Sequence, residues 1–180
     1  MWRSTWRCRR SSVGRRPRGA ARGAARQLGL LKPIEKWLLK RIERPRYQHI
    51  FLGNVNRRAN KGTGFHHRYQ GKNPPTARVR RDANGNELKD PPNSHGAYRA
   101  KVDVRDEDGT WYRKNGKSSF FPDSWTPKQV DEAINTAFKN ATPDPANPNK
   151  WVGNLPNGMQ IQGFYSGNLK KGWYSAWPVV

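Results

Sequence analysis

Eight residues near the middle of the chain alternate strictly between two kinds of side chain. The apolar positions are Tyr98, Ala100, Val102 and Val104, and the polar positions between them are Arg99, Lys101, Asp103 and Arg105. This period of two predicts a strand with one face in a core and the other in water. Asp108-Gly109 is a turn signal, and Trp111-Tyr112 begins a return strand. An antiparallel sheet is therefore the framework that the rest of the chain must fit.

One helix and two further strands can be predicted after this hairpin. Thr126 and Gln129 form a capping box around Pro127, and the following helix has Val130, Ile134 and Phe138 on one face. The Pro/Asn-rich residues 142–150 are expected to end the helix and form a loop. Strands are predicted for 159–165 and 172–177, with a turn at 166–168.

The N-terminal part divides into two segments by composition. Residues 1–27 hold nine arginines and no acid, which predicts a disordered leader; a nucleic-acid-binding arm or a targeting peptide is the alternative. Residues 28–46 are expected to form a linker helix that begins at Pro33 and ends at Pro45. Residues 47–180 then form one α+β domain, with helices mostly N-terminal to a meandering antiparallel sheet. Within it, residues 70–95 are expected to be loops and turns around a short extended piece at 77–80.

Charge and cysteine content limit the function classes. The chain has 35 Lys and Arg against 13 Asp and Glu, a formal net charge of +22, which predicts a polyanionic partner such as RNA. The single cysteine, Cys8, excludes a disulfide framework and a cysteine-based zinc site. No apolar run is long enough to span a bilayer, and no secretory signal is visible, so no membrane partner is expected. Export would need a specialised secretion system or a larger polypeptide that carries this chain.

Histidines supply the candidate chemistry. His49 lies in an apolar run that is expected to be a strand, and His66 and His67 follow a glycine-rich turn at 62–64 where a phosphate could approach backbone N–H groups. Two imidazoles can act as base and acid on RNA, whose 2′-hydroxyl is a nucleophile beside each phosphate. Adjacent His66 and His67 would point to opposite faces of a strand, so only one of them fits such a site. His95 is expected to be a loop residue.

A cation is expected beside the reacting phosphate, because negative charge develops there during cleavage. Lys114 and Lys117 precede Ser118-Ser119-Phe120-Phe121-Pro122, and Lys101 on the neighbouring strand is a third candidate. The spacing leaves all three open. No zinc site is expected, because no cysteine or carboxylate stands near the adjacent histidines. No Walker motif, nucleophile elbow or paired-carboxylate motif is present, which favours acid–base cleavage of RNA over other enzyme classes.

Four motifs together resemble those of the bacterial EndoU-type ribonucleases, in the same order from about residue 47 to the C-terminus. They are His49-Ile50-Phe51-Leu52-Gly53, Gly64-Phe65-His66-His67, Ser118 to Trp125, and Ser175-Ala176-Trp177-Pro178. The resemblance implies an EndoU/barnase-like α+β fold and, as the second catalytic histidine, His66. It implies that His49 is the base and His66 the acid, although the direction could be reversed.

The resemblance also implies substrate contacts, partners and a setting. The Ser175 hydroxyl would contact the base and Trp177 would stack on the nucleotide, where the family commonly has Tyr; His67 and Ser119 are further candidates for substrate contact. Such domains are often toxins of bacterial competition, which implies a delivered effector that cuts RNA, tRNA among the candidates, in the cytoplasm of a target cell. It implies an acidic immunity protein and no cofactor. The alternative hypothesis is a non-catalytic basic protein that binds RNA or ribosomes. A third hypothesis is a DNA-binding or architectural protein.

Overall fold

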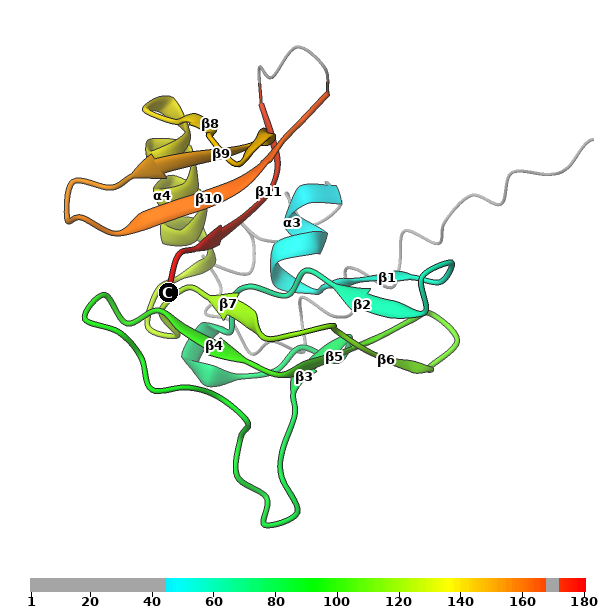
Figure 1. The fold of residues 1–180 in the computed structure, drawn as a ribbon. Helices are drawn as coiled ribbons and strands as arrows, with labels where there is room; N and C mark the ends of the chain where they lie inside the picture. The colour runs from blue at the N-terminus through cyan, green and yellow to red at the C-terminus, as the bar shows by residue number, and fades with distance from the viewer. Residues whose placement is uncertain (1–44, 168–171) are drawn as a thin grey trace, which may run out of the picture.

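The computed structural model describes residues 45–167 and 172–180 of the chain. The leader predicted for 1–27 lies outside the described residues, and so does the linker helix predicted for 28–46, apart from Pro45 and Arg46. The described part is α+β, with antiparallel strands in four small sheets and two helices (Figure 1). None of its helices is long and apolar enough to cross a membrane.

The first described element is the helix α3, Pro45–Phe51. It buries Tyr47, Ile50 and Phe51, a spacing of three and four residues that suits one face of a helix. The strand expected around His49 is therefore wrong, because a short apolar run alone cannot distinguish the two structures. Pro45, expected to end a helix, begins this one, where its missing N–H costs nothing.

A group of short strands follows α3. The antiparallel pair β1, Asn54–Asn56, and β2, Lys61–Thr63, comes first, and the 3-10 turn η1, Tyr69–Gly71, follows. The three-stranded sheet β3-β5-β6 contains Ala77–Val79, Val102–Arg105 and Trp111–Arg113. The two-stranded sheet pairs β4, Tyr98–Ala100, with β7, Ser118–Phe120.

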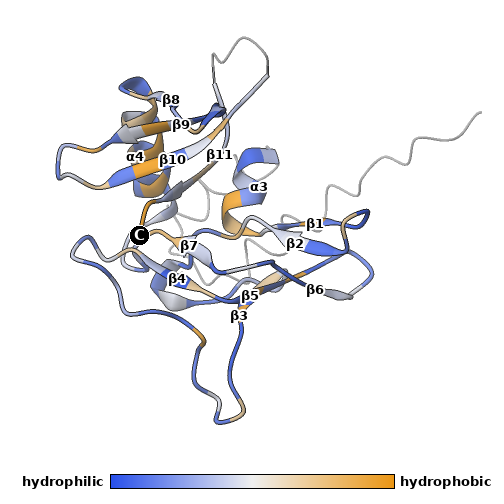
Figure 2. Cartoon of the chain, in the orientation of Figure 1, coloured by the Kyte–Doolittle hydropathy of each residue, from blue (hydrophilic) through white to orange (hydrophobic). Residues whose placement is uncertain are grey.

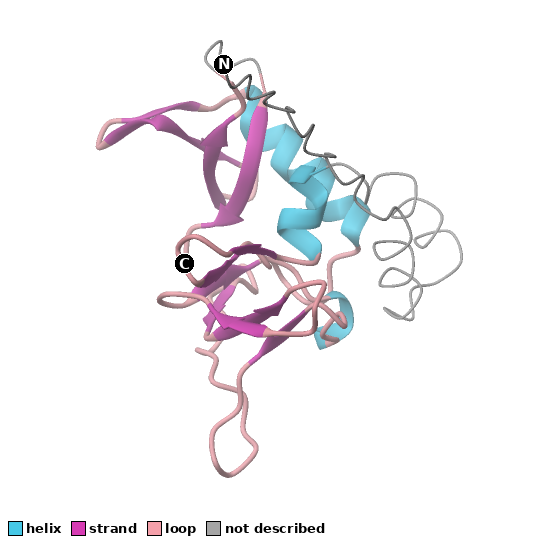
Figure 3. Cartoon of the chain, turned by 90° about the vertical axis from the view of Figure 1, so that its right-hand side faces the viewer, coloured by secondary structure: helices cyan, strands magenta, loops and turns pink. Residues whose placement is uncertain are grey.

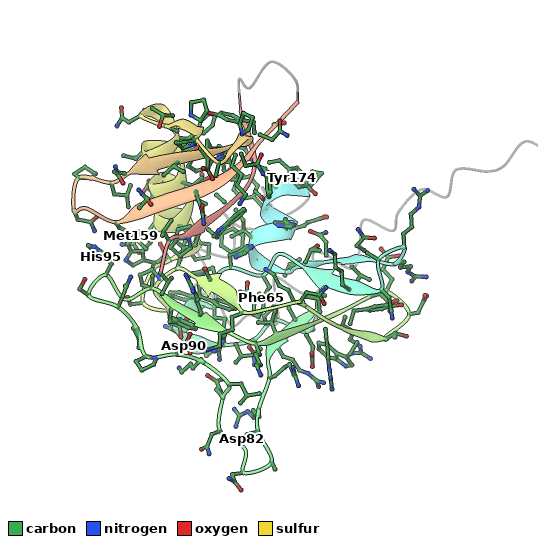
Figure 4. The ribbon with its side chains drawn as sticks, viewed as in Figure 1. Phe65, Asp82, Asp90, His95, Met159 and Tyr174 are labelled. Atoms are coloured by element: carbon green, nitrogen blue, oxygen red, sulfur yellow. The ribbon has the colours of Figure 1, made fainter. Side chains whose placement is uncertain are left out.

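The strand predicted for 98–105 is divided in two at Lys101. β4 pairs with β7, whereas β5 pairs with β3 and β6, so the chain changes sheets between them. Buried and exposed side chains alternate as predicted at every other position. Asp103, which was expected to be exposed, is buried at 8 % exposure. It is paired with Arg78, with 3.3 Å between the charged groups. Between β3 and β4 the chain makes a long, mostly hydrophilic excursion with Asp82 near its tip (Figures 2 and 4).

The second half holds the helix α4, Pro127–Lys139, and the four-stranded antiparallel sheet β11-β10-β9-β8. The predicted capping box is confirmed: the Thr126 side chain accepts a hydrogen bond from the Gln129 N–H, and the Gln129 side chain accepts one from the Thr126 N–H. β10, Gln160–Tyr165, and β11, Trp173–Pro178, lie within a residue of the predicted strands. The loop expected at 142–150 is wrong, because β8, Thr142–Asp144, and β9, Asn147–Asn154, form there.

The buried apolar side chains form two cores. The larger one lies between α3, α4 and the four-stranded sheet, and the smaller one, which includes Phe65, Tyr98 and Phe120, lies among the short strands. Both helices lie on the same side of the four-stranded sheet (Figure 3). α4 follows β7 in the chain, so the helices are not grouped N-terminal to the strands as expected. α3 packs against β11, and β11 against β7, so the two halves meet where the predicted site residues lie.

Candidate active site

Two backbone hydrogen bonds bring the histidine motifs together. The Phe65 N–H donates to the His49 carbonyl and the His66 N–H to the Ile50 carbonyl, both at 2.7 Å. Gly64, between β2 and this contact, has φ of +72°, and a Cβ there would lie 2.2 Å from the His49 carbonyl oxygen. Only glycine fits this approach. The N–H groups of Phe65 and His66 thus bind α3 and are not available to a phosphate.

The two imidazoles lie next to each other as a result. The ring centroids of His49 and His66 are 5.8 Å apart, with 40° between the ring planes. Both rings line an open cleft between α3, the β6–β7 region and β11. Lys114, Ser118, Tyr174 and Trp177 line the same cleft. A phosphate placed in it could therefore meet two imidazoles and an ammonium group.

Each imidazole is held through Nδ1. His66 Nδ1 donates to the Ser119 carbonyl oxygen, 2.8 Å away. A carbonyl oxygen can only accept, so Nδ1 carries the proton and Nε2 of the neutral ring has the free lone pair. His49 Nδ1 lies 3.1 Å from the Asn54 side-chain oxygen, in the equivalent arrangement. In both residues the hydrogen bond fixes the ring and leaves Nε2 for proton transfer.

The surroundings keep both histidines neutral near pH 7. Burial, with the nearby charge of Lys114, lowers the pKa of His49 to about 4, while the hydrogen bond to Asn54 opposes this shift. Burial lowers the pKa of His66 well below its usual value, and the charges of Lys114 and His49 act in the same direction. An anion in the cleft would raise both pKa values again, because it stabilises the protonated ring.

Lys114 and Lys117 have different environments. Lys114 Nζ donates to the Gly64 carbonyl and to Ser118 Oγ, each at 2.9 Å, which uses two of its three hydrogens. Burial lowers the pKa of Lys114 to about 8. Lys117 is at the exposed rim of the cleft and is paired with Asp90. Lys101 is exposed between β4 and β5 and does not line the cleft.

Ser118 connects the lysine to the histidine. Its hydroxyl donates to the Phe65 carbonyl at 2.8 Å and lies 3.3 Å from His66 Nδ1. Together with the bond from Lys114, these contacts fill its hydrogen-bonding capacity. Ser119 contributes its carbonyl to His66 and also lines the cleft. Ser118 and Ser119 thus fix the relative positions of the ammonium group and the imidazole.

The terminal motif forms the wall of the cleft beside His66. The indole of Trp177 is stacked on the His66 ring, with 5.6 Å between centroids and 22° between planes. Ser175, on the same strand, is 2 % exposed and lines the cleft. Two predicted substrate-contact residues therefore lie near the histidine pair.

The remaining histidines lie elsewhere. His67 is buried away from the cleft, where its Nε2 donates to the Trp125 carbonyl at 2.8 Å and its ring packs edge-on against Phe51. This placement does not support the substrate contact predicted for His67. His95 lies in the loop before β4, away from Tyr174 and near the turn that precedes Met159 (Figure 4). Within 45–167 and 172–180, no three His, Cys, Asp or Glu residues are grouped so as to hold a metal ion.

Known proteins resemble this chain in sequence. A sequence model of the family described as bacterial EndoU nuclease matches residues 43–179. The chain belongs to this family of nucleases. It is also similar to a protein of Bacillus cereus named "Toxin", with 35 % identity over 78 residues, 43 % of this chain and 14 % of the relative. The chain thus spans only a small part of that relative's length. No solved structure matches.

Three residues of the EndoU domain's cleft were missed in the sequence. Tyr174 is 46 % exposed and its ring lies 5.6 Å from that of His49. Phe164, on β10, is 38 % exposed and lies 5.6 Å from the Trp177 ring. Asn54 holds His49. A register shift opposite Phe164 and Tyr165 puts Tyr174 outside the regular alternation, so no sequence pattern signalled it; the exposed Phe164 could have been found from the alternation along β10.

Proposed function

We propose that this EndoU domain is a metal-independent endoribonuclease that uses the RNA's own 2′-hydroxyl as the nucleophile. The observation that carries the proposal is the pair of imidazoles, His49 and His66, whose centroids lie 5.8 Å apart in an open cleft beside Lys114. The pair provides a base and an acid in one cleft, and the lysine provides a positive charge.

The proposed reaction proceeds by in-line displacement at phosphorus. Nε2 of His49 takes the proton of the 2′-hydroxyl as its oxygen attacks the phosphorus atom. The bond from phosphorus to the 5′-oxygen breaks, and protonated His66 gives its proton to that oxygen. The products are a 2′,3′-cyclic phosphate and a 5′-hydroxyl. The reverse assignment exchanges the two histidines and gives the same products.

Lys114 is the lysine that we assign to the developing charge. Its ammonium group is held by Gly64 and Ser118 and retains one hydrogen for the phosphorane oxygens. With a pKa of about 8, it is largely protonated at pH 7. Lys117 is less suited, because its charge is already paired with Asp90 at the exposed rim.

The biological setting is part of the same proposal. Similarity to the Bacillus cereus protein named "Toxin" supports a delivered effector. Our proposal adds that the effector cuts RNA, with tRNA among the candidate substrates, in the cytoplasm of a target cell. A producing cell would need an inhibitor. The net charge of +22 favours an acidic immunity protein that occupies the cleft. Ser175 and Trp177 would contact the nucleotide at the cleaved position.

The test uses one RNA of defined sequence and a second copy with a single 2′-deoxyribose at the mapped cleavage position. The ribose substrate should be cut to a cyclic phosphate and a 5′-hydroxyl, with and without EDTA. The deoxy substrate should bind with similar affinity and stay intact, because it has no nucleophile. Cleavage of the deoxy substrate, or activity that EDTA removes and a divalent ion restores, would contradict the proposed chemistry. A folded preparation that binds RNA but never cuts it would favour the non-catalytic RNA-binding alternative.

A further inference from the structure

The four-stranded sheet has one covered face and one open face. Trp151, Ile161 and Ala176 lie on the face toward the helices, within the larger core. On the other face, none of the described helices covers the strands (Figures 1 and 3). Strand register determines which side chains share this open face, because directly paired residues point the same way.

Two cross-strand rows occupy the open face and lead away from the catalytic cleft. In one row Lys150, Phe164 and Ser175 are paired across β9, β10 and β11. Ser175, at the cleft end of this row, is buried where β11 contacts β7. In the adjacent row Thr142, Val152, Gln162 and Trp177 are paired across β8 to β11. Trp177 and Ser175 therefore belong both to the cleft and to this face. The rows continue the site without a break.

The chemistry of the rows suits unpaired nucleotides. Phe164 is 38 % exposed, a large apolar side chain left in solvent beside Trp177. Lys150 Nζ lies 5.7 Å from the Phe164 ring centroid, so a positive charge is placed beside a stacking surface. Thr142 and Gln162 add hydrogen-bonding groups, and neither row contains an acidic residue. Aromatic rings with adjacent cations on an open sheet are a recurrent way to bind single-stranded RNA.

We propose that this open face, from Trp177 through Phe164 to Lys150, binds the unpaired nucleotides on one side of the scissile phosphate. The inference depends on the proposed function, since it places the RNA flank relative to the histidine pair. Continuity with the cleft and the absence of acidic side chains favour RNA over an acidic protein as the occupant. The substrate class is then RNA that is single-stranded beyond the cleaved dinucleotide, and a base-paired flank should not fit.

The test compares kcat/KM for a minimal RNA with that for the same RNA extended by three nucleotides on its 5′ or its 3′ side. Extension on one side only should raise kcat/KM about tenfold, because each base stacked on an aromatic side chain contributes roughly 1–3 kcal/mol. Pairing the extension with a complementary strand should remove the gain. For each variant, the gain is kcat/KM for the extended RNA divided by kcat/KM for the minimal RNA. A substitution that changes cleavage of both RNAs equally therefore leaves the gain unchanged.

Matched variants assign the gain to the open face. Phe164→Leu and Lys150→Gln should each lose most of it, whereas Phe164→Trp, which keeps a ring for stacking, should retain it. Lys139→Gln removes a charge from the exposed end of α4, away from this face, and should keep the full gain.

No gain on either side, an equal gain on both sides, or the same gain in Phe164→Leu, Lys150→Gln and the wild type would overturn the inference. Each of these results is obtained with an RNA that is still cleaved, so the proposed function would stand. Failure to cut any RNA would instead contradict the proposed function itself.

Discussion

The His66 imidazole is stacked on the Trp177 indole, with 5.6 Å between ring centroids and 22° between planes. Trp177 therefore covers one face of the His66 ring, and both residues line the cleft. Burial is the main reason that the pKa of His66 lies well below its usual value. If the proposed function is right, this single aromatic side chain affects both the proton chemistry of His66 and the binding of the nucleotide.

Replacing Trp177 should separate these two effects. Trp177→Leu should lower kcat/KM about tenfold through lost stacking and should raise the His66 pKa, because water reaches the ring. Trp177→Tyr keeps an aromatic ring and should change both much less. NMR titration of the His66 ring gives the pKa, and cleavage of a short RNA gives the rate. An unchanged His66 pKa in Trp177→Leu would show that the indole does not control its burial.

His49, His66 and His67 should respond differently to replacement by alanine. His49→Ala and His66→Ala should each reduce cleavage by about 10²–10⁴-fold while RNA binding stays nearly unchanged. His67→Ala should keep the cleavage rate of the folded protein but lower the free energy of unfolding by roughly 2–4 kcal/mol, since it leaves a cavity and an unpaired Trp125 carbonyl. Single-turnover cleavage, filter binding and urea unfolding measure these quantities. A stable but inactive His67→Ala variant would contradict the assignment of His66.

Removing the charge of Lys114 should change both rate and pH dependence. The Lys114 charge lowers the pKa of both His49 and His66, so Lys114→Met should raise both pKa values and move the acidic limb of the kcat/KM profile to higher pH. The rate at its optimum should fall about 10²–10³-fold, as for loss of one charge-stabilising donor. Lys117→Met is the control and should leave the position of the acidic limb unchanged. If Lys117→Met shifts the limb and Lys114→Met does not, the two lysines have exchanged roles.

Gly64 should tolerate no side chain. Gly64→Ala would place a Cβ 2.2 Å from the His49 carbonyl oxygen at a φ of +72°, so the contact between α3 and the segment of His66 must open. The backbone conformation alone costs about 1–2 kcal/mol, and the clash adds to it. Gly85→Ala is a matched control, because Gly85 has φ of +85° and nothing within 4 Å of the added Cβ. Thermal melting and cleavage assays should show a much larger loss for Gly64→Ala; equal losses would mean that only the φ matters.

Stability should fall in mild acid. Burial lowers the pKa of His49 and His67 to about 4 and holds that of His66 well below its usual value. As pH falls below 6.5 the unfolded chain gains protons on these residues that the folded state does not, so the free energy of unfolding decreases. His67 alone should account for about 2 kcal/mol of this decrease by pH 5. Urea unfolding between about pH 7 and pH 5 measures it, and His67→Gln should flatten the curve. A wild-type curve that is already flat would contradict the buried neutral state.

The sequence by itself determined those features that depend on neighbours along the chain. The α4 capping box of Thr126 and Gln129, the alternation from Tyr98 to Arg105, and strands β10 and β11 all follow from local periodicity and capping. Motif order likewise indicated the EndoU family, which the match over residues 43–179 confirms. The roles assigned to the histidines and lysines remain proposals.

Local patterns failed where two conformations suit the same residues. The apolar run after His49 fits a strand or a helix, and the core under α3 selects the helix. Residues 142–150 have loop-like composition, yet pairing with β10 makes β9 a strand. The alternation at 98–105 could not reveal that the strand changes sheets at Lys101. In each case a partner far away in the chain supplies the deciding interaction.

Only the tertiary structure decided which chemical groups share the cleft. The sequence left Lys101, Lys114 and Lys117 open, and the fold places Lys114 against Gly64 and Ser118. It places His66 in the cleft and His67 outside it, because the His66 ring is bound to the Ser119 carbonyl and the His67 ring to the Trp125 carbonyl. Tyr174 lines the cleft because a register shift between β10 and β11 takes it out of the regular strand pairing. The spacing of residues along the chain determines which side chains share one face of a helix or strand. Packing between distant segments determines the distances between side chains, their burial and therefore their pKa values.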